Sequence, residues 1–466
     1  MKKIKKMSRK KINKLPVMLL RIWLIYTVVC LVFPPLFHKS AAETESVLTD
    51  MPEYATAQER VLSIDNNMDA LLWRLRLIEA AKERVALSTF DFRDDESGQD
   101  MMSALLHAAD RGVEVQILVD GINGALWLTR SKNFRQLAAH ECVEVKFYNP
   151  VNLLKPWKIN YRMHDKYLIA DDFAYILGGR NTNDLFLGNY KDSYNEDRDI
   201  LVYETVPGKG SSYIELQEYF EKIWSLPCCK QFEKRGGGEY LEEHYRKVRE
   251  KYPEAFLETE WETVTIGANG IELCTNPIEP ENKRPQLWER LALEMGQADD
   301  ILIQTPYIIC SRKMYQELTD ICTDATRAEL IINATEGGAN PFGCTDYLNQ
   351  KKNVRETGLY IYEYAGSQAL HTKTILAGEN ISIVGSCNLD MRSVYLDTEM
   401  MLVIDSPELN ASLRTRAEIL KAQSKKVSPD GTVTEGENYQ PVRLNGVKKI
   451  VYGVLRVLVI PFRHLF

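Results

Sequence analysis

Apolar and polar positions follow two periods along the chain, and the two alternate in the same order in each half. Between residues 68 and 81, apolar side chains recur at the spacing of one helix face: Leu71, Leu72, Leu75, Leu77 and Ile78. In the first half we expect a helix, a strand, a helix and a strand over residues 68–81, 85–92, 100–110 and 113–120. In the second half we expect a strand, a helix and a strand over residues 299–307, 313–325 and 328–334. This alternation predicts two similar α/β lobes, each a mixed β-sheet flanked by helices.

The two halves are joined by a segment of different character, and each end of the chain carries a further apolar run. We expect five parts: a basic N-terminus with an apolar helix (1–45), a first lobe (46–206), a helical connector (207–265), a second lobe (266–424) and a tail (425–466). Within the connector, residues 213–224 predict a helix that closes the first lobe. A length of 466 residues suggests two or three domain-sized units.

The N-terminal run covers residues 16–33, which are apolar except for Arg21 and Thr27 and follow a block of lysines and an arginine. A helix of this length would span about 27 Å, close to the hydrocarbon thickness of a bilayer. The pattern predicts either a signal peptide, cleaved after Ala42, or an uncleaved signal anchor. In both cases the basic end stays in the cytoplasm, and we expect the two lobes outside it, associated with the membrane.

The C-terminal run follows a polar stretch. Residues 425–442 predict a loop-like segment, and residues 447–462 then combine valine, leucine and isoleucine with Lys448, Lys449 and Arg456. This run is shorter and more basic than a spanning helix, so we expect a helix that lies at a membrane interface. The alternative is a helix packed onto the protein body.

Charge is distributed unevenly between the ends and the body. The whole chain has a net charge of −7, so +8 on residues 1–46 and +5 on residues 443–466 leave −20 on residues 47–442. A body this acidic lacks the basic footprint of a nucleic-acid-binding protein. Basic residues beside apolar runs at both ends are typical of contact with a membrane surface.

Reactive residue types occur twice, once in each half. The first motif is His164-x-Lys166 followed by Asp171, and the second is His371-x-Lys373 followed, at the same offset, by a glycine, Gly378. The flanks of both motifs predict a strand, which directs alternate residues to one face and places imidazole and ammonium side by side. A repeat at fixed offsets indicates a duplicated lobe.

Each motif is followed by the same pair of small and amide side chains. Gly179 and Asn181 come 15 and 17 residues after the first histidine, and Ser386 and Asn388 follow the second at the same offsets. Lysine neutralises a phosphate, asparagine and backbone N–H groups donate hydrogen bonds to it, and histidine attacks or moves a proton. We therefore expect these four residues to bind a substrate phosphate, with no metal or other cofactor because the lysines supply positive charge.

These motifs, together with residues 94–98, 178–181, 385–393 and 397–399, resemble those of the phospholipase D superfamily. Within it, the chain is most similar to bacterial cardiolipin synthases of the C-type branch, over roughly residues 60–466. The resemblance implies two phospholipase D-type lobes with the active site at their pseudo-twofold interface. The departure is Gly378, where the family has an Asp that mainly supports neighbouring structure, so we expect the second histidine to work.

The resemblance also implies roles for single residues. The side chains that it makes catalytic are His164, Lys166, Asp171, His371, Lys373 and Glu399. The first histidine attacks phosphorus and the second protonates the leaving alcohol. A carboxylate that follows each Asn then pairs with a histidine. Glu399 is this residue in the second half, whereas in the first half we expect Asp199, with Asp197 as the alternative because the first half has extra residues.

The implied reaction passes through a phosphatidyl-histidine. Attack on this intermediate by the glycerol headgroup of phosphatidylglycerol would give cardiolipin, and attack by water would give phosphatidic acid. We therefore expect a membrane-associated phosphatidyltransferase, with a hydrolytic phospholipase D as the alternative and a nuclease or a non-catalytic lipid-binding relative as remoter ones. The expected partners are phosphatidylglycerol, a second phospholipid and the membrane, without nucleic acid, and the protein is expected to act as a monomer.

Overall fold

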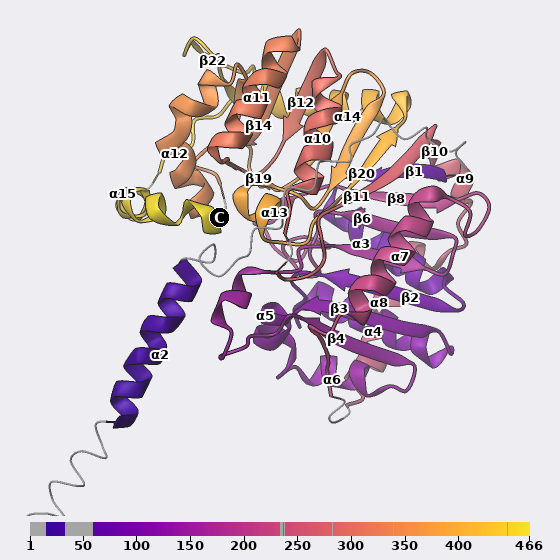
Figure 1. The fold of residues 1–466 in the computed structure, drawn as a ribbon. Coiled ribbons are helices and arrows are strands. Elements are labelled where there is room, and N and C mark those ends of the chain that lie inside the picture. Colours follow the sequence, from indigo (N-terminus) through magenta and orange to yellow (C-terminus); the bar gives the residue numbers. More distant parts are fainter. Residues whose placement is uncertain are drawn as a thin grey trace, which may run out of the picture.

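The structure is a computed structural model in which residues 15–32, 59–233, 236, 238–281, 283–338, 340–444 and 446–466 are described. The basic block before residue 15 and the expected cleavage site at Ala42 lie outside the described residues. Figure 1 shows two lobes, one built from the first half of the chain and one from the second half.

The first lobe is built on a nine-stranded mixed sheet with the order β10-β1-β8-β6-β5-β2-β3-β4-β9. Its strands are β1 (Glu59–Ile64), β2 (Arg84–Thr89), β3 (Glu114–Asp120), β4 (Val143–Tyr148), β5 (Tyr167–Ala170), β6 (Ala174–Gly178), β8 (Asp199–Glu204), β9 (Cys229–Gln231) and β10 (Ile266–Gly267). Strands β2, β3 and β4 are parallel, and all other neighbours pair antiparallel. The helices of this lobe are α3 (Asn67–Ala80), α4 (Glu96–Asp110), α5 (Gly121–Asn123), η2 (Gly124–Leu128), α6 (Lys132–Ala139) and η3 (Pro156–Asn160).

The second lobe repeats this plan, with a nine-stranded sheet in the order β11-β20-β18-β17-β12-β14-β15-β21-β22. Its strands are β11 (Gly270–Thr275), β12 (Asp300–Gln304), β14 (Arg327–Asn333), β15 (Tyr360–Tyr364), β17 (Thr374–Ala377), β18 (Ile381–Gly385), β20 (Met400–Asp405), β21 (Ser424–Val427) and β22 (Val433–Glu435). Its helices are α10 (Gln286–Gly296), α11 (Arg312–Asp324), α12 (Pro341–Glu356) and α13 (Met391–Tyr395). The expected pair of α/β lobes is thus confirmed.

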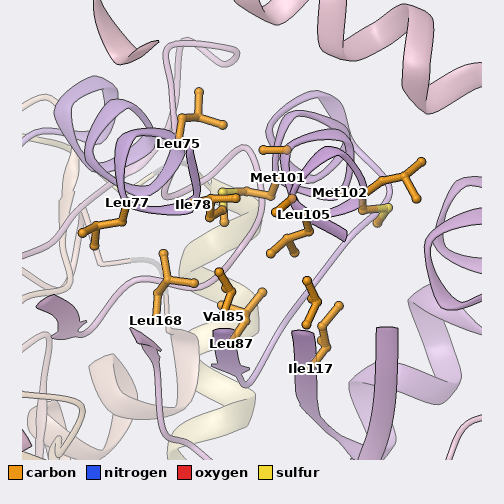
Figure 2. Packing of buried hydrophobic residues seen from close by; sticks show 14 of the residues in the cluster. Leu75, Leu77, Ile78, Val85, Leu87, Met101, Met102, Leu105, Ile117 and Leu168 are labelled. Carbon is orange, nitrogen blue, oxygen red and sulfur yellow. The ribbon is translucent and has the colours of Figure 1, made fainter. Parts of the chain in front are cut away.

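Helices α3 and α4 cover one face of the first sheet, as the helical spacing of their apolar residues predicted. In Figure 2, Ile78 of α3 and Leu105 of α4 lie between the helices and Val85, Leu87 and Leu168 of the strands below. Both helices begin at a side-chain cap, since Asn66 accepts a hydrogen bond from the N–H of Asp69 and Asp95 accepts one from Gly98. The cap places the start of α3 within one residue of the expected helix, whereas α4 begins four residues before the helix expected over 100–110.

The opposite faces of the two sheets meet in a second core that belongs to both lobes. Ile169 and Leu177 of the first sheet share one buried cluster with Leu376 and Val384 of the second. Helices α7 (Ser211–Ser225) and α14 (Pro407–Ala422) contribute to the same cluster. Two short strand pairs also lie outside the large sheets: β7 (Asn195–Glu196) with β16 (Ala369–Leu370), and β13 (Ile308–Ile309) with β19 (Leu389–Asp390).

The connector packs onto the first lobe, and part of the tail joins the second sheet. Helix α8 (Tyr240–Lys251), η4 (Pro253–Phe256) and α9 (Trp261–Val264) pack onto the first lobe, and His244 contacts Asp100 of α4 at 2.8 Å. The polar stretch after residue 424 adds β21 and β22 to the second sheet, where we expected a loop-like segment. Lys425 of β21 pairs there with Glu363 of β15 at 2.9 Å, so the charge of this lysine is satisfied within the sheet, and apolar patterning could not reveal the strand.

Both apolar ends are helical where they are described. Helix α2 (Leu15–Val32) contacts the first lobe, and α15 (Gly446–Val459) packs on α12 before the short helix η5 (Ile460–Leu465). Within the described ranges, no helix combines the length and the apolarity that crossing a membrane requires.

Candidate active site

The two His-x-Lys motifs hold equivalent places in the two sheets. His164 and Lys166 directly precede β5, and His371 and Lys373 directly precede β17. Because β5 runs antiparallel to β2, and β17 to β12, both motifs lie at the edge where the parallel strands end. The backbone ties each motif to the opposite lobe, since the N–H of His164 donates to Thr398 O (3.3 Å) and that of His371 donates to Glu196 O (2.7 Å).

Each histidine meets a carboxylate from the other lobe. Glu399 Oε1 lies 2.8 Å from His164 Nδ1, and Asp197 Oδ2 lies 2.5 Å from His371 Nδ1. Both carboxylates are fully buried, whereas the side chains of His164 and His371 are 12% and 22% exposed. A carboxylate on Nδ1 fixes the orientation of an imidazole, so Nε2 of each ring is left for chemistry.

Asp199, the expected supporting carboxylate of the first half, does not contact a histidine. Its carboxylate binds Arg74 (2.9 Å) and Arg180 (3.3 Å) in the first lobe. The strand register explains why: Gly178 pairs with Asp199, whereas its counterpart Gly385 pairs with Met401. The counterpart of Glu399 is therefore Asp197, two residues earlier, and the alternative that we had considered is the one in place.

Asp171, which we expected among the catalytic side chains, lies in the turn between β5 and β6 and has there the supporting role that the resemblance also gives to this Asp. Its carboxylate accepts hydrogen bonds from the backbone N–H groups of residues 82, 83 and 84 at 2.7 to 2.9 Å. Gly378 holds the same turn in the second lobe, with φ of +60° against +48° for Asp171. The departure from the family pattern thus lies in a turn, away from both histidines.

The two lysines are buried beside their histidines. The ammonium of Lys166 donates to the carbonyl of His164, and that of Lys373 donates to the carbonyl of His371 and lies 2.6 Å from the Nδ1 of that ring. Lys373 Nζ is also 3.7 Å from Asp197 Oδ2. Burial lowers the pKa of Lys166 to about 7, so a buried positive charge is held there only weakly until an anion arrives.

The small and amide residues after each motif separate into two kinds. A Cβ atom on Gly179 would lie 2.3 Å from Asp197 Oδ1, and Ser386 instead donates its hydroxyl to Glu399 Oε2 at 2.5 Å. These two positions therefore serve the carboxylates. Asn181 and Asn388 are buried, and in the described part of the chain their Oδ1 atoms have no hydrogen-bond partner. Since buried polar groups are rarely left unpaired, these two amides are suited to a ligand.

Burial and charge shift the pKa values of the four cross-lobe residues in different directions. Burial lowers the pKa of His371 to about 4 and that of His164 well below its usual value, and the neighbouring lysines lower both further. Burial also raises the pKa of Glu399 to about 8. For Asp197 burial acts in the same upward direction, but Lys373 and His371 outweigh it and hold the pKa of this carboxyl below its ordinary value. Both imidazoles are thus neutral at pH 7.

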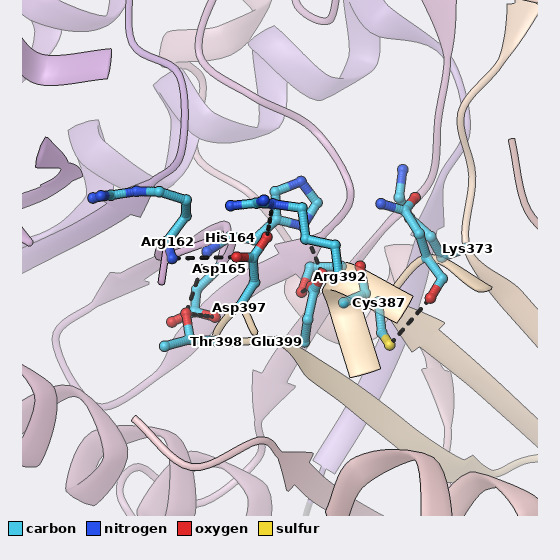
Figure 3. A network of polar contacts seen from close by, with 12 residues as sticks. Arg162, His164, Asp165, Lys373, Cys387, Arg392, Asp397, Thr398 and Glu399 are labelled. Atoms are coloured by element: carbon cyan, nitrogen blue, oxygen red, sulfur yellow. Dashed lines mark hydrogen bonds and ion pairs between the residues drawn. The ribbon is translucent and has the colours of Figure 1, made fainter. Parts of the chain in front are cut away.

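Three further side chains at the site were not expected. Phe90 and Phe186 stand edge-on to His164 and His371, each with ring centroids 5.0 Å apart. Arg392 binds Asp397 at 3.0 Å, and its charge also lowers the pKa of His164. Figure 3 shows Arg392 and Asp397 beside His164 and Glu399, with Lys373 at the other end of the network. No spacing in the sequence signals the two phenylalanines, whereas Arg392 lies inside the conspicuous stretch 385–393.

Comparison with known proteins places this arrangement in a family. The family model described as "Cardiolipin synthase, PLD-like domain" matches residues 75–224 and 292–420. The chain belongs to this family. It is a phospholipase D-type enzyme of the phosphatidyltransferase class, as the resemblance implied, and each matched segment contains one His-x-Lys motif.

Individual relatives agree with this family. Cardiolipin synthase C of Escherichia coli is 25% identical over 393 residues, which cover 74% of this chain and 81% of the relative. The major cardiolipin synthase of Bacillus subtilis is 27% identical over 356 residues, covering 74% of this chain and 65% of the relative. The crystal structure of a phosphatidylserine synthase from Haemophilus influenzae superposes with a TM-score of 0.63 at 14% identity and covers 87% of this chain and 95% of that one, so the fold is shared.

The described residues contain no group of three or more His, Cys, Asp or Glu side chains arranged to hold a metal ion. The basic side chains at the site are Lys166, Lys373 and Arg392, which come from both lobes. Two neutral imidazoles with opposed carboxylates, two buried ammonium groups and two free amides can together bind a phosphodiester and transfer its phosphoryl group.

Proposed function

We propose that the protein is a membrane-associated cardiolipin synthase that works through a phosphatidyl-histidine. The observation that carries the proposal is that each lobe supplies the carboxylate for the histidine of the other lobe, an arrangement that we call the carboxylate exchange. Glu399 contacts His164, and Asp197 contacts His371. This exchange requires both lobes to be closed on one another, and it supports a single site that contains both rings. Support for the lipid substrate comes from the cardiolipin synthases among the relatives.

The reaction would proceed in two displacements. In the first, Nε2 of one histidine attacks the phosphorus of a phospholipid, a P–N bond forms, and the P–O bond to the headgroup alcohol breaks as the second histidine gives that alcohol a proton. In the second, the now basic second histidine takes a proton from the glycerol headgroup of phosphatidylglycerol, whose oxygen attacks phosphorus and releases the first histidine. Lys166, Lys373 and the amides of Asn181 and Asn388 would hold the phosphate oxygens.

The division of roles between the histidines has two competing assignments. The family resemblance gives the attack to His164. The two carboxylates favour His371, because an ionised Asp197 accepts the Nδ1 proton and leaves a lone pair on Nε2. Glu399, with a pKa of about 8, would carry a proton at pH 7 and donate it to Nδ1 of His164, which places the ring proton on Nε2 as a general acid needs.

Hydrolysis is the second candidate, since water can replace the acceptor alcohol. The test is to incubate the purified full chain with phosphatidylglycerol, alone and mixed with phosphatidylethanolamine, and to identify the products by mass spectrometry. We expect cardiolipin to exceed phosphatidic acid, and His371→Ala to form neither. Phosphatidic acid as the sole product would establish the hydrolytic reading, and an unchanged product pattern in His371→Ala would contradict the proposed site.

The membrane location is part of the same proposal. The basic and apolar N-terminal run, as a signal peptide or an anchor, would place the lobes on the extracytoplasmic side. Fractionation of cells that express the full chain, combined with protease access from outside, tests this placement. Recovery of the lobes in a cytosolic, protease-protected fraction would exclude it.

A further inference from the structure

Large apolar side chains are exposed on two segments of the first lobe. Leu126 and Trp127 are exposed on η2, which follows β3, and Val151, Leu153 and Leu154 are exposed on the segment that follows β4. Leu154 is 82% exposed. Both segments therefore leave the sheet at the ends of parallel strands and present leucine or tryptophan to solvent, which is uncommon for surface loops.

The second lobe presents its apolar residues on α15. This helix is fixed to the loop after β14, because Tyr452 donates its hydroxyl to Thr335 O (3.2 Å) and Lys448 donates to Glu336 O (2.8 Å). It buries only Tyr452 and Val459. The large apolar residues that it leaves exposed are Val447, Ile450, Val451, Val454, Val457 and Leu458.

These apolar segments share an edge with the catalytic histidines. Strands β3 and β4 run parallel to β2, and β14 runs parallel to β12, so the segments that follow them emerge at the same ends of the sheets. The His-x-Lys motifs lie at this edge too, before β5 and β17. A surface that rests on these segments would therefore face the site.

Helix α2 approaches the same edge. The indole N–H of Trp23 donates to Leu153 O at 3.1 Å, and the hydroxyl of Tyr26 donates to Leu154 O at 3.4 Å. In Figure 1, α2 and α15 lie on the same side of the molecule, next to the C-terminus. The N-terminal helix thus contacts the most exposed apolar segment of the first lobe.

The charges of these segments distinguish one class of partner. Residues 124–132, 151–160 and 446–459 contain Arg130, Lys132, Lys155, Lys158, Lys448, Lys449 and Arg456, and no Asp or Glu. The body as a whole is strongly acidic. Lys158 is paired at 3.3 Å with Glu281, which lies outside these segments. Apolar side chains with an excess of basic ones match the surface of an anionic bilayer, in which acyl chains lie beneath negative headgroups.

We propose that η2, residues 151–155 and α15 form one docking rim that rests on an anionic bilayer and brings the headgroups to the two histidines. The inference rests on the proposed lipid function and specifies how the substrate reaches that site. The rim surrounds the site from both lobes, so a lipid moves from the bilayer into the site without crossing bulk water. Leu126, Trp127, Leu153 and Leu154 enter the acyl region, and the basic residues contact the headgroups.

A spectroscopic test measures docking without any need for turnover. The full chain is mixed with phosphatidylglycerol vesicles whose acyl chains carry bromine, and tryptophan quenching is compared between the wild type and Trp127→Phe. We expect the wild type to lose more fluorescence than Trp127→Phe, and the difference to shrink at least threefold in brominated phosphatidylcholine vesicles. Equal quenching of the two proteins in the anionic vesicles would contradict the proposal that the rim docks on the bilayer.

A kinetic test uses Leu126→Ser/Leu153→Ser/Leu154→Ser, which changes exposed side chains only. We expect its transfer rate on phosphatidylglycerol vesicles to fall at least tenfold, and its rate on a short-chain, monomeric phosphatidylglycerol to stay within twofold of the wild type. Leu257→Ser is the matched control, since Leu257 is an exposed leucine of the connector, outside the rim. An equal loss on both substrates, or a loss in the control as large as in the rim variant, would refute the proposal.

The two tests separate this inference from the proposed function. If the wild type transfers no lipid in any form but Trp127 is quenched, the function fails and the rim stands. If transfer occurs without quenching of Trp127, the function stands and the rim fails. Conversion of a dimer to a monomer by the rim substitutions would assign the surface to a second copy of the chain and also overturn the proposal.

Discussion

The two histidine clusters occupy equivalent positions, but their carboxylates have different surroundings. Asp197 lies beside Lys373 and receives a hydrogen bond from the N–H of Arg198 (2.8 Å), and Gly179 leaves it room. Glu399 accepts a hydrogen bond from the hydroxyl of Ser386. In the described residues, the one basic side chain that contacts Glu399 is His164, whose imidazole is neutral. A duplicated fold can therefore give two histidines opposite proton preferences by changing the partner carboxylate and the groups around it.

The same contrast extends one layer deeper. Asp199 and Met401 hold equivalent register positions, and Arg180 and Cys387 follow Gly179 and Ser386 in the two lobes. The first lobe thus has a buried ion pair where the second lobe has a thioether and a thiol. Charged side chains occur in this layer only in the first lobe, where a carboxylate and a guanidinium are paired; the second lobe has uncharged side chains at both positions.

Removal of either histidine is the change with the largest expected effect. His164→Ala and His371→Ala should each lower turnover of a natural lipid by about 10³-fold or more, because each removes a reacting group. A phosphatidyl ester of p-nitrophenol, whose leaving group needs no acid, separates the two roles. The variant that lacks the nucleophile should release no burst of p-nitrophenol, and the variant that lacks the acid should still release one. Mass spectrometry of the quenched protein then shows whether the phosphatidyl group is attached to it. A burst retained by His164→Ala assigns the attack to His371, and the converse restores the order implied by the family.

The carboxylates allow an isosteric comparison. Asp197→Asn should lower kcat by about 10² to 10⁴-fold, because an amide in place of an ionised acceptor favours the wrong tautomer of His371. Glu399→Gln should lower kcat only about tenfold, since the amide N–H₂ can donate to Nδ1 as a protonated carboxyl does. Steady-state rates on one substrate measure both. Losses of equal size would show that the two carboxylates have the same protonation state.

The pH dependence follows from the same groups. Burial, aided by Lys373, lowers the pKa of His371 to about 4, so kcat/KM should rise as pH increases through this value and frees the imidazole. Burial lowers the pKa of Lys166 to about 7 and raises that of Glu399 to about 8, and kcat/KM should fall as both lose protons on the alkaline side. Lys166→Arg should move the alkaline fall to higher pH, because guanidinium stays protonated. If kcat/KM of this variant falls at the same pH as that of the wild type, deprotonation of Lys166 is not the cause of the alkaline fall.

Substitutions in this deeper layer should lower the stability of the fold and have little effect on turnover. Asp199→Asn leaves Arg74 and Arg180 without their carboxylate and should lower the free energy of unfolding by about 3–5 kcal/mol. Met401→Leu, at the equivalent position of the other lobe, should lower it by less than about 1.5 kcal/mol. Denaturant unfolding of the two variants gives the comparison. If both changes have the same small effect, the ion pair of the first lobe contributes no more than the thioether of the second.

The smallest expected effect is that of restoring the missing acid. Gly378→Asp should leave turnover unchanged and change the free energy of unfolding by no more than about 1 kcal/mol, because Asp171 adopts the same positive φ in the first lobe. A Cβ on Gly378 would also meet no atom within 4 Å. Kinetics and thermal unfolding of this variant check both statements. A clear change in turnover would mean that the turn acts on the second histidine.

Much of the fold and part of the site could be predicted from the chain alone. The helix expected over residues 68–81 spans Asn67–Ala80, and the strand expected over 113–120 spans Glu114–Asp120, because their apolar residues repeat with the period of the element they form. The segment around residues 425–435 was expected to be loop-like but forms β21 and β22, since a strand that carries Lys425 and Lys426 has no apolar signature. Among the carboxylates, the chain order favoured Asp199 because it directly precedes an apolar run.

The sequence by itself determined the duplication, the paired His-x-Lys motifs and the type of each regular element, because these depend on residue identity and on spacing over a few residues. Only the tertiary structure decided that Asp197 serves His371, that Glu399 serves His164, and that three distant apolar segments share one edge. These outcomes depend on strand register and on contacts between residues of different lobes, which lie 174 and 235 positions apart in the chain. Register is set by the packing of whole sheets, and such packing leaves no local signal in the order of residues.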